Sequence, residues 1–215
     1  YVVTNISDAL YSEADINFDG NDSVKRTEEG TSTMGITAEN FSNTNTNFGK
    51  VNFVVTDGLL TITPASIDPE LPNPTDPDNP TENTRFEVTG LTDVVYNGAE
   101  QKQTPTITDT TTGEKLVKDT DYTITCNTED FTNAGTITYT LKGKGNYSGT
   151  RVVSYKIKQR VVNLKSDTAS KTYDGTELTR HDVTVTGDGF VKGEATAIAT
   201  GSVTYVSEGE VTNTI

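Results

Sequence analysis

Apolar and polar residues alternate strictly along several short stretches of the chain. In DYTITC, Tyr122, Ile124 and Cys126 fall on one side of an extended backbone and two threonines on the other. The same period of two recurs at 51–55, 137–141, 153–157 and 183–185. This period predicts half-buried β-strands. No stretch sustains a helical period, and the best candidate for a helical turn is TAENF at 37–41. The pattern therefore predicts an all-β chain.

Two features of composition fit that prediction. Threonine occupies 41 of the 215 positions, and its β-branched side chain favours a pleated backbone without adding apolar surface. Asn-Gly at 97–98 and Asp-Gly at 57–58, 174–175 and 188–189 lie between the alternating stretches. These dipeptides are typical of tight turns between strands.

The prolines are concentrated in one segment. Six of the seven lie within the seventeen residues PASIDPELPNPTDPDNP, which begin at Pro64. Each proline fixes φ and biases the preceding residue towards an extended conformation. We therefore expect residues 64–84 to be an acidic, extended linker, in which the seventeen-residue proline-rich stretch, at roughly 3.1 Å per residue, spans about 50 Å.

Internal similarity divides the rest of the chain into repeats. VVYNGAEQ at 94–101 matches KTYDGTEL at 171–178, and EADINFDGNDSV at 13–24 matches EATAIATGSVTY at 194–205. Repeats of this kind indicate tandem modules. The expected organisation is the C-terminal part of a first β repeat at 1–63, the linker at 64–84, a complete central repeat at 85–158, and the N-terminal part of a third repeat at 159–215.

The fold expected for each module is a small antiparallel β structure. An immunoglobulin-like sandwich is the first expectation, and a β-grasp-like sheet is the alternative for the units that open with Tyr-Asn-Gly or Tyr-Asp-Gly. Partial repeats would leave strand edges unpaired, and unpaired edges invite pairing with another chain. Head-to-tail self-association of the first and third repeats is therefore expected.

These motifs resemble a known group of repeats. KTYDGTEL, the later TGSVTYVSEGEVTNTI, and TMGITAENFSNTNTNFGKVNFVVTDGLLTITP at 33–64 are similar to MBG and YDG-type repeats of bacterial surface proteins and adhesins. The central unit is similar to a related Ig-like extracellular repeat, with Tyr-Asn-Gly followed by Asp-Tyr, Asn-Ala-Gly and Gly-Asn-Tyr. The resemblance covers most of the chain outside the linker.

The resemblance implies a location and a role. Such modules belong to secreted or cell-wall-attached proteins, often of Gram-positive bacteria, so an extracellular, cell-surface position is expected. The implied function is a non-catalytic stalk or spacer of an adhesin. The alternative is a ligand-binding repeat that contacts host glycan or an extracellular protein. The resemblance supplies no catalytic, cofactor-binding or metal-binding residues.

Charge narrows the range of partners. Seventeen basic and thirty-one acidic residues give a net charge of −14, which repels nucleic acid and anionic bilayers. Nucleic acid is not an expected partner, and no stretch is apolar enough to insert into a membrane. The acidity is concentrated in residues 1–84, with 3 basic and 14 acidic groups, whereas residues 85–158 carry 9 of each.

Few residues offer chemistry. DINFDGND begins like a calcium loop with Asp15, Asn17, Asp19 and Gly20, but its twelfth position is Arg26, where a bidentate carboxylate is needed. A strand that runs into a glycine turn is the favoured interpretation. We therefore predict no metal and no cofactor.

Nucleophilic chemistry has equally few candidates. Cys126 and His181 are the only candidate thiol and imidazole, and they lie in different repeats, with Cys126 on an apolar face. A dyad of this pair is therefore not favoured, and no catalytic residue is predicted.

Tyrosine is the remaining candidate for recognition, because the chain has nine tyrosines and no tryptophan. Tyr122, Tyr139 and Tyr155 lie on apolar faces and are predicted to be core residues. Three others flank glycine turns and could be exposed platforms for a sugar or packing residues; packing is favoured, because the placement recurs between repeats. They are Tyr96, Tyr147 and Tyr173.

Overall fold

The computed structural model describes residues 1–215 and is nearly all-β. It contains eighteen short strands, three single 3-10 turns and no α-helix. No helix of the length and apolarity needed to cross a membrane is present. The all-β prediction is confirmed, and its cause is the period-two pattern supported by threonine.

The chain divides into two compact units, which are described separately. Unit 1 consists of Tyr1–Phe86, Leu116–Thr123 and Lys142–Arg151. Unit 2 consists of Glu87–Lys115, Ile124–Leu141 and Val152–Ile215.

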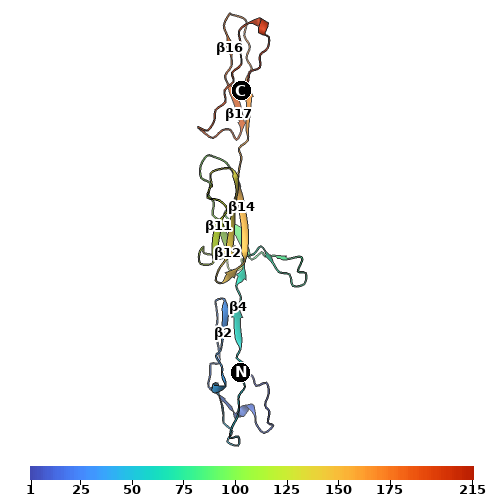
Figure 1. Ribbon diagram of the computed structural model, residues 1–215, viewed down its shortest axis with the longest axis vertical. Helices are drawn as coiled ribbons and strands as arrows, with labels where there is room; N and C mark the ends of the chain where they lie inside the picture. Colours follow the sequence, from blue (N-terminus) through green and yellow to red (C-terminus); the bar gives the residue numbers. More distant parts are fainter. The chain divides into compact units, whose positions relative to one another are not determined.

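The first sixty residues form two antiparallel strand pairs and two 3-10 turns (Figure 1). β1 (Ile16–Phe18) pairs with β3 (Phe41–Asn43), and β2 (Gly30–Thr33) pairs with β4 (Leu59–Ile62). The 3-10 turns are η1 (Glu13–Asp15) and η2 (Ala38–Asn40). η2 confirms the helical turn predicted at 37–41.

The strand predicted at 51–55 is wrong, because these residues enter no ladder. Their side chains do alternate: Val51 and Phe53 are half-buried, while Val54 is 97% exposed. Alternation reports only which side chains are buried, whereas a strand also needs a backbone partner alongside it.

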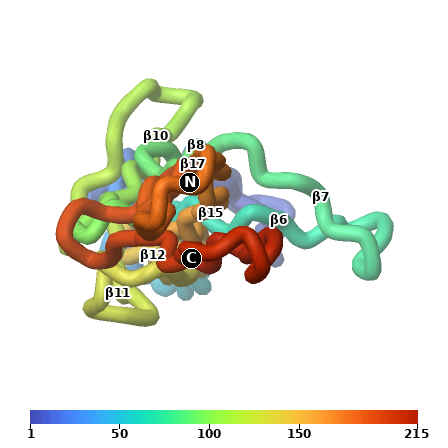
Figure 2. Tube along the Cα trace, turned by 90° about the horizontal axis from the view of Figure 1, so that it is seen from above, coloured from blue at the N-terminus to red at the C-terminus, as the bar shows by residue number.

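The proline-rich segment folds back on itself, so the structure does not confirm an extended linker. β6 (Glu70–Leu71) pairs antiparallel with β7 (Thr81–Glu82), and Figure 2 shows the chain reversing between them. At the start of the segment, β5 (Ala65–Ser66) pairs in parallel with β13 (Tyr147–Ser148). Prolines fix φ but leave turns open to the residues between them, and Asn73 accepts backbone N–H bonds from Thr75 and Asp76 in such a turn.

Two residues of this segment are buried. Ile67 is fully buried, and Asn83 is 5% exposed. The Asn83 amide donates to the backbone carbonyls of Ser66 and Asp68, both at 2.8 Å. Asn83 thus holds together the two ends of the proline-rich hairpin.

The main sheet has four strands in the order β11-β12-β14-β9. Figure 1 shows β11, β12 and β14 side by side. Their bounds are β11 (Tyr122–Cys126), β12 (Gly135–Gly143), β14 (Thr150–Lys158) and β9 (Val94–Val95). A separate pair joins β8 (Phe86–Thr89) to β10 (Thr106–Asp109). The strands predicted within 122–126, 137–141 and 153–157 are confirmed.

The core of unit 2 is a cluster of buried residues on one face of this sheet: Phe131, Ile137, Tyr139, Tyr155 and Ile157. β9 runs parallel to β14, with Val94 opposite Ile157. The pairing is therefore not antiparallel throughout, as the sequence had led us to expect.

The last sixty residues form two antiparallel pairs. β15 (Val162–Ser166) pairs with β17 (Val183–Gly187), and β16 (Leu178–Thr179) pairs with β18 (Ser202–Val203). η3 (Val206–Glu208) follows. β17 confirms the strand predicted at 183–185. Leu164 and Val185 face each other while 40% and 41% exposed, so this part of the chain buries a small core.

Candidate functional site

The residues that resemble a calcium loop do not converge. The Asp15 carboxylate accepts hydrogen bonds from the Ser12 N–H at 2.8 Å and the Ser12 hydroxyl at 3.0 Å, and the N–H bond lowers the pKa of Asp15. The Asn17 amide donates to the Ser42 hydroxyl at 3.4 Å, and Arg26 donates to Ser32. These contacts are structural, and no group of three or more His, Cys, Asp or Glu side chains in residues 1–215 could hold a metal ion.

The thiol and the imidazole occupy different strand systems. Cys126 ends β11 and packs against the core cluster. The Nδ1 of His181 is hydrogen-bonded to the Ala199 carbonyl at 2.8 Å, and the Ala199 N–H donates to the His181 carbonyl at 3.1 Å. His181 therefore joins two segments of the third module.

The predicted core tyrosines are confirmed. Tyr122 and Tyr139 are 4% exposed and Tyr155 is 1% exposed. The Tyr139 hydroxyl donates to the Gln103 carbonyl at 2.5 Å, and the Tyr155 hydroxyl donates to the Gln101 carbonyl at 2.9 Å. Burial raises the pKa of Tyr139 to about 12.

The three turn tyrosines differ from one another. Tyr147 packs edge-on against Phe86, with ring centroids 5.8 Å apart, and Tyr96 is half-buried. Packing is therefore correct for these two. Tyr173 is 57% exposed, so the expectation of packing is wrong at that position.

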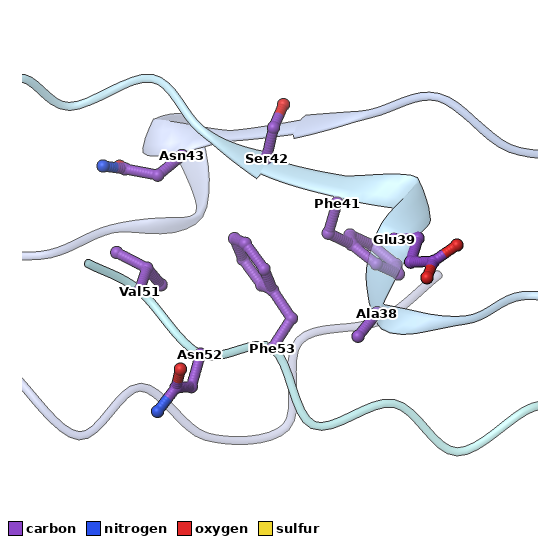
Figure 3. Close-up of a pocket in the computed structure, with 8 residues that line it drawn as sticks. All are labelled: Ala38, Glu39, Phe41, Ser42, Asn43, Val51, Asn52 and Phe53. Carbon is purple, nitrogen blue, oxygen red and sulfur yellow. The ribbon is translucent and has the colours of Figure 1, made fainter.

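The first module contains a hollow that the sequence did not predict. It has a volume of about 570 Å³ and is lined by Ala38, Glu39, Phe41, Ser42, Asn43, Val51, Asn52 and Phe53. The ring centroids of Phe41 and Phe53 lie 5.7 Å apart. Ser42 and Asn52 point away from the hollow (Figure 3). The Asn43 amide is already bonded to the carbonyls of Asn45 and Phe48. The lining of the hollow is an even mixture of apolar and polar residues.

The aromatic rings beside the hollow form a small cluster of their own. The ring of Phe18 lies 5.0 Å from that of Phe41, and Tyr1 lies 5.2 Å from both. Rings at such separations pack favourably edge-on or offset. The simplest role of these side chains is to hold β1 against β3.

A charged contact strengthens the parallel pair of β9 and β14. The Lys158 ammonium lies 3.0 Å from the Asp93 carboxylate, whose other oxygen accepts the Lys156 N–H at 2.9 Å. These two interactions lower the pKa of Asp93, with the Lys158 contribution larger. The Tyr96 N–H donates to the Lys158 carbonyl at 2.9 Å. β9, the first strand of this sheet along the chain, is thus tied to β14, the last one along the chain.

Arg160 joins the central repeat to the third within unit 2. Its guanidinium donates to the carbonyl of Tyr96 at 2.9 Å, to that of Gly189 at 2.7 Å, and to that of Asp188. The Asp188 carboxylate accepts the Val161 N–H at 2.7 Å. One side chain thereby connects the Tyr-Asn-Gly turn to the loop after β17.

The rest of this junction packs on the Tyr-Asn-Gly turn. The Tyr96 hydroxyl donates to the Glu194 carboxylate, and this bond raises the pKa of Tyr96. Gly98 has φ +78°, and a Cβ there would lie 2.9 Å from Val191 Cγ1. A small residue is required at this position.

These contacts hold strands and loops together. Asp93 and Lys158 brace a strand pair, and Arg160 braces a junction between modules. Of these features, the sequence predicted only the Tyr-Asn-Gly turn that contains Tyr96. Comparison with protein-family models, with curated proteins and with solved structures finds no match to this chain.

Proposed function

We propose that the chain is a stalk or spacer segment of a bacterial surface adhesin that transmits tension along its length, without catalytic activity. It belongs to the cell-surface repeats of MBG and YDG type that its motifs resemble, and it works outside the cell, at the wall. The central repeat, residues 85–158, is proposed to be an immunoglobulin-like sandwich in which the β8–β10 pair covers the core face of the four-stranded sheet.

The parallel pairing of β9 with β14 carries this proposal. β9 comes early in the repeat and β14 closes it, and both point the same way. Tension on the two ends of the repeat then pulls these strands in opposite directions along their length. All bonds between them bear the load together, whereas an antiparallel hairpin pulled at its open end loses one bond at a time.

Side chains reinforce that pair where the force arrives. Asp93 precedes β9 and contacts both the backbone of Lys156 and the ammonium of Lys158. Arg160 lies two residues after the end of β14 and ties the chain to the next module through Asp188 and Gly189. Tension applied at the C-terminal end of β14 is therefore shared with the hydrogen bonds of Arg160.

Single-molecule stretching of the full chain between its two ends tests the proposal. The expected result is a distinct force peak that releases roughly 220 Å of chain, the length held between Asp93 and Lys158 at about 3.4 Å per residue. Lys158→Gln should lower the force of this peak. Lys118→Gln is the matched control, because its ion pair with Asp119 joins sequence neighbours. Extension of the chain without a distinct force peak would contradict the proposal that this repeat resists tension.

A ligand-binding repeat is the second candidate, and the hollow of the first module supports it. Sugars commonly contact aromatic rings, and the half-buried Phe41 and Phe53 line the hollow. The full chain should be applied to a glycan array, with Phe53→Leu as the variant and Val54→Thr, on an exposed neighbour, as the control. Binding that Phe53→Leu alone abolishes would favour this candidate over a pure spacer.

A further inference from the structure

The Tyr-Asx-Gly turn occurs twice with the same local geometry. In Tyr96–Gly98 the Asn97 side chain accepts the Ala99 N–H at 2.9 Å. In Tyr173–Gly175 the Asp174 side chain accepts the Thr176 N–H at 2.9 Å. The two glycines have φ values of +78° and +76°. Both copies therefore form the same Asx turn.

The first copy of the turn is occupied by a neighbouring module. Val191 covers Gly98, and Glu194 accepts the hydroxyl hydrogen bond of Tyr96. Arg160 donates to the Tyr96 carbonyl. The turn thus provides a flat glycine surface and a phenol group that an apolar residue and a carboxylate of another module bind together.

The second copy is open. Tyr173 is 57% exposed, and no atom lies within 4 Å of the position that a Cβ on Gly175 would take. The turn is nevertheless held in place, because the Lys171 ammonium contacts Asp174 at 2.9 Å and Thr176 at 2.5 Å. The Tyr173–Gly175 turn therefore presents, without an occupant, the same surface that Val191 covers at Gly98.

The first module carries side chains that match the occupant of the first turn. Alignment of residues 13–24 with 194–205 places Glu13 at the position of Glu194, and three residues earlier it places Leu10 at the position of Val191. Leu10 is 83% exposed and Glu13 is exposed.

We infer that the Tyr173–Gly175 turn is a docking surface for a second copy of this chain, which binds through Leu10 and Glu13 of its first module. Leu10 lies over Gly175, and the Glu13 carboxylate accepts the hydrogen bond of the Tyr173 hydroxyl. The two surfaces are different patches of one molecule, so the contact is heterologous and links copies head to tail. The inference is independent of the proposed role under tension, because association is measured without force.

Sedimentation velocity of the full chain at rising concentration tests the inference. The expected result is a mass that grows beyond that of the 23.1 kDa monomer. Tyr173→Ala should keep the chain monomeric, and so should the paired change Leu10→Ser with Glu13→Gln. Tyr205→Ala is the matched control, because Tyr205 is another tyrosine of the third module, 59% exposed. Circular dichroism checks that each variant is folded.

Mixing the two blocked variants gives the decisive result. Tyr173→Ala keeps the Leu10/Glu13 surface but lacks the intact turn, whereas the Leu10/Glu13 variant keeps the turn but lacks the surface that binds it. Each molecule in the mixture can therefore make one contact, and the mixture should form one-to-one dimers and nothing larger. A chain that is monomeric at every concentration overturns the inference. Association that persists in Tyr173→Ala, or a mixture that stays monomeric while the unaltered chain associates, also overturns it.

Discussion

The ammonium of Lys158 lies 3.0 Å from the carboxylate of Asp93, and this contact ties the last residue of β14 to the residue before β9. Both side chains are substantially exposed, so water screens their attraction and the contact contributes little to stability at rest. Its position at the end of a parallel pair makes it more important under tension. Protonation of the Asp93 carboxylate would remove its attraction to Lys158, so the contact between the two strands depends on pH.

Asp93 should make stability depend on pH in the acid range. Its pKa in the folded chain is lowered by Lys158 and the Lys156 N–H, below the value of about 3.9 in an unfolded chain. The stabilisation is therefore present above about pH 4 and is lost as pH falls through the lowered pKa. Because the pair is exposed, the effect is small. Urea unfolding should show Asp93→Asn slightly less stable than the unaltered chain at neutral pH and equal to it in strong acid.

Asp119→Asn is the control for this measurement, because Asp119 lies 4.0 Å from its lysine partner, a sequence neighbour. A difference between Asp93→Asn and the unaltered chain that stays constant down to strong acid would show that charge is not the cause.

Tyr139 should limit stability in alkali. Its pKa of about 12 in the folded chain exceeds the value of about 10 in an unfolded chain. Below pH 10 both states keep the proton, whereas between these values only the folded state keeps it. Stability should therefore fall as pH rises from about 10 to about 12. Tyr139→Phe should show a shallower fall, measured by urea unfolding across this range, and an unchanged slope would contradict the assignment.

Gly98 and Gly175 form a matched pair that separates backbone strain from crowding. Both have positive φ, so alanine at either position should cost about 1 kcal/mol of backbone strain. Only at position 98 would the new methyl group collide with Val191. Gly98→Ala should therefore lower the free energy of unfolding more than Gly175→Ala, in dilute solution where the chain is monomeric. Equal losses would show that the Arg160 junction tolerates a side chain there.

Asn83 should hold the proline-rich hairpin in place. Replacement by alanine leaves the part-buried carbonyls of Ser66 and Asp68 without their donor, at a cost of about 1 kcal/mol. Limited proteolysis should then cut residues 68–83 faster. Asn52→Ala, on an exposed residue, is the control. A hairpin equally resistant in both variants would argue against this role.

The sequence signals at these sites were uneven. The turn at Tyr96 could be identified because Asn-Gly has a local conformational preference. The roles of Asp93 and Arg160 could not be predicted from the sequence. Their partners, Lys158 and Gly189, lie far along the chain, and a charged residue gives no local indication of its partner. The proline-rich hairpin was missed for a similar reason. Asn83 reads as a polar loop residue until its carbonyl partners are known.

The period of two along the chain was enough to predict strands and to predict which of their faces are buried. Side chains of an extended backbone alternate between two faces, so the pattern around Tyr122, Tyr139 and Tyr155 predicts their burial. Strand partners and strand directions became known from the three-dimensional structure. Every strand offers the same backbone donors and acceptors, so the parallel pairing of β9 with β14 and the failure of 51–55 to pair depend on contacts distant in the chain.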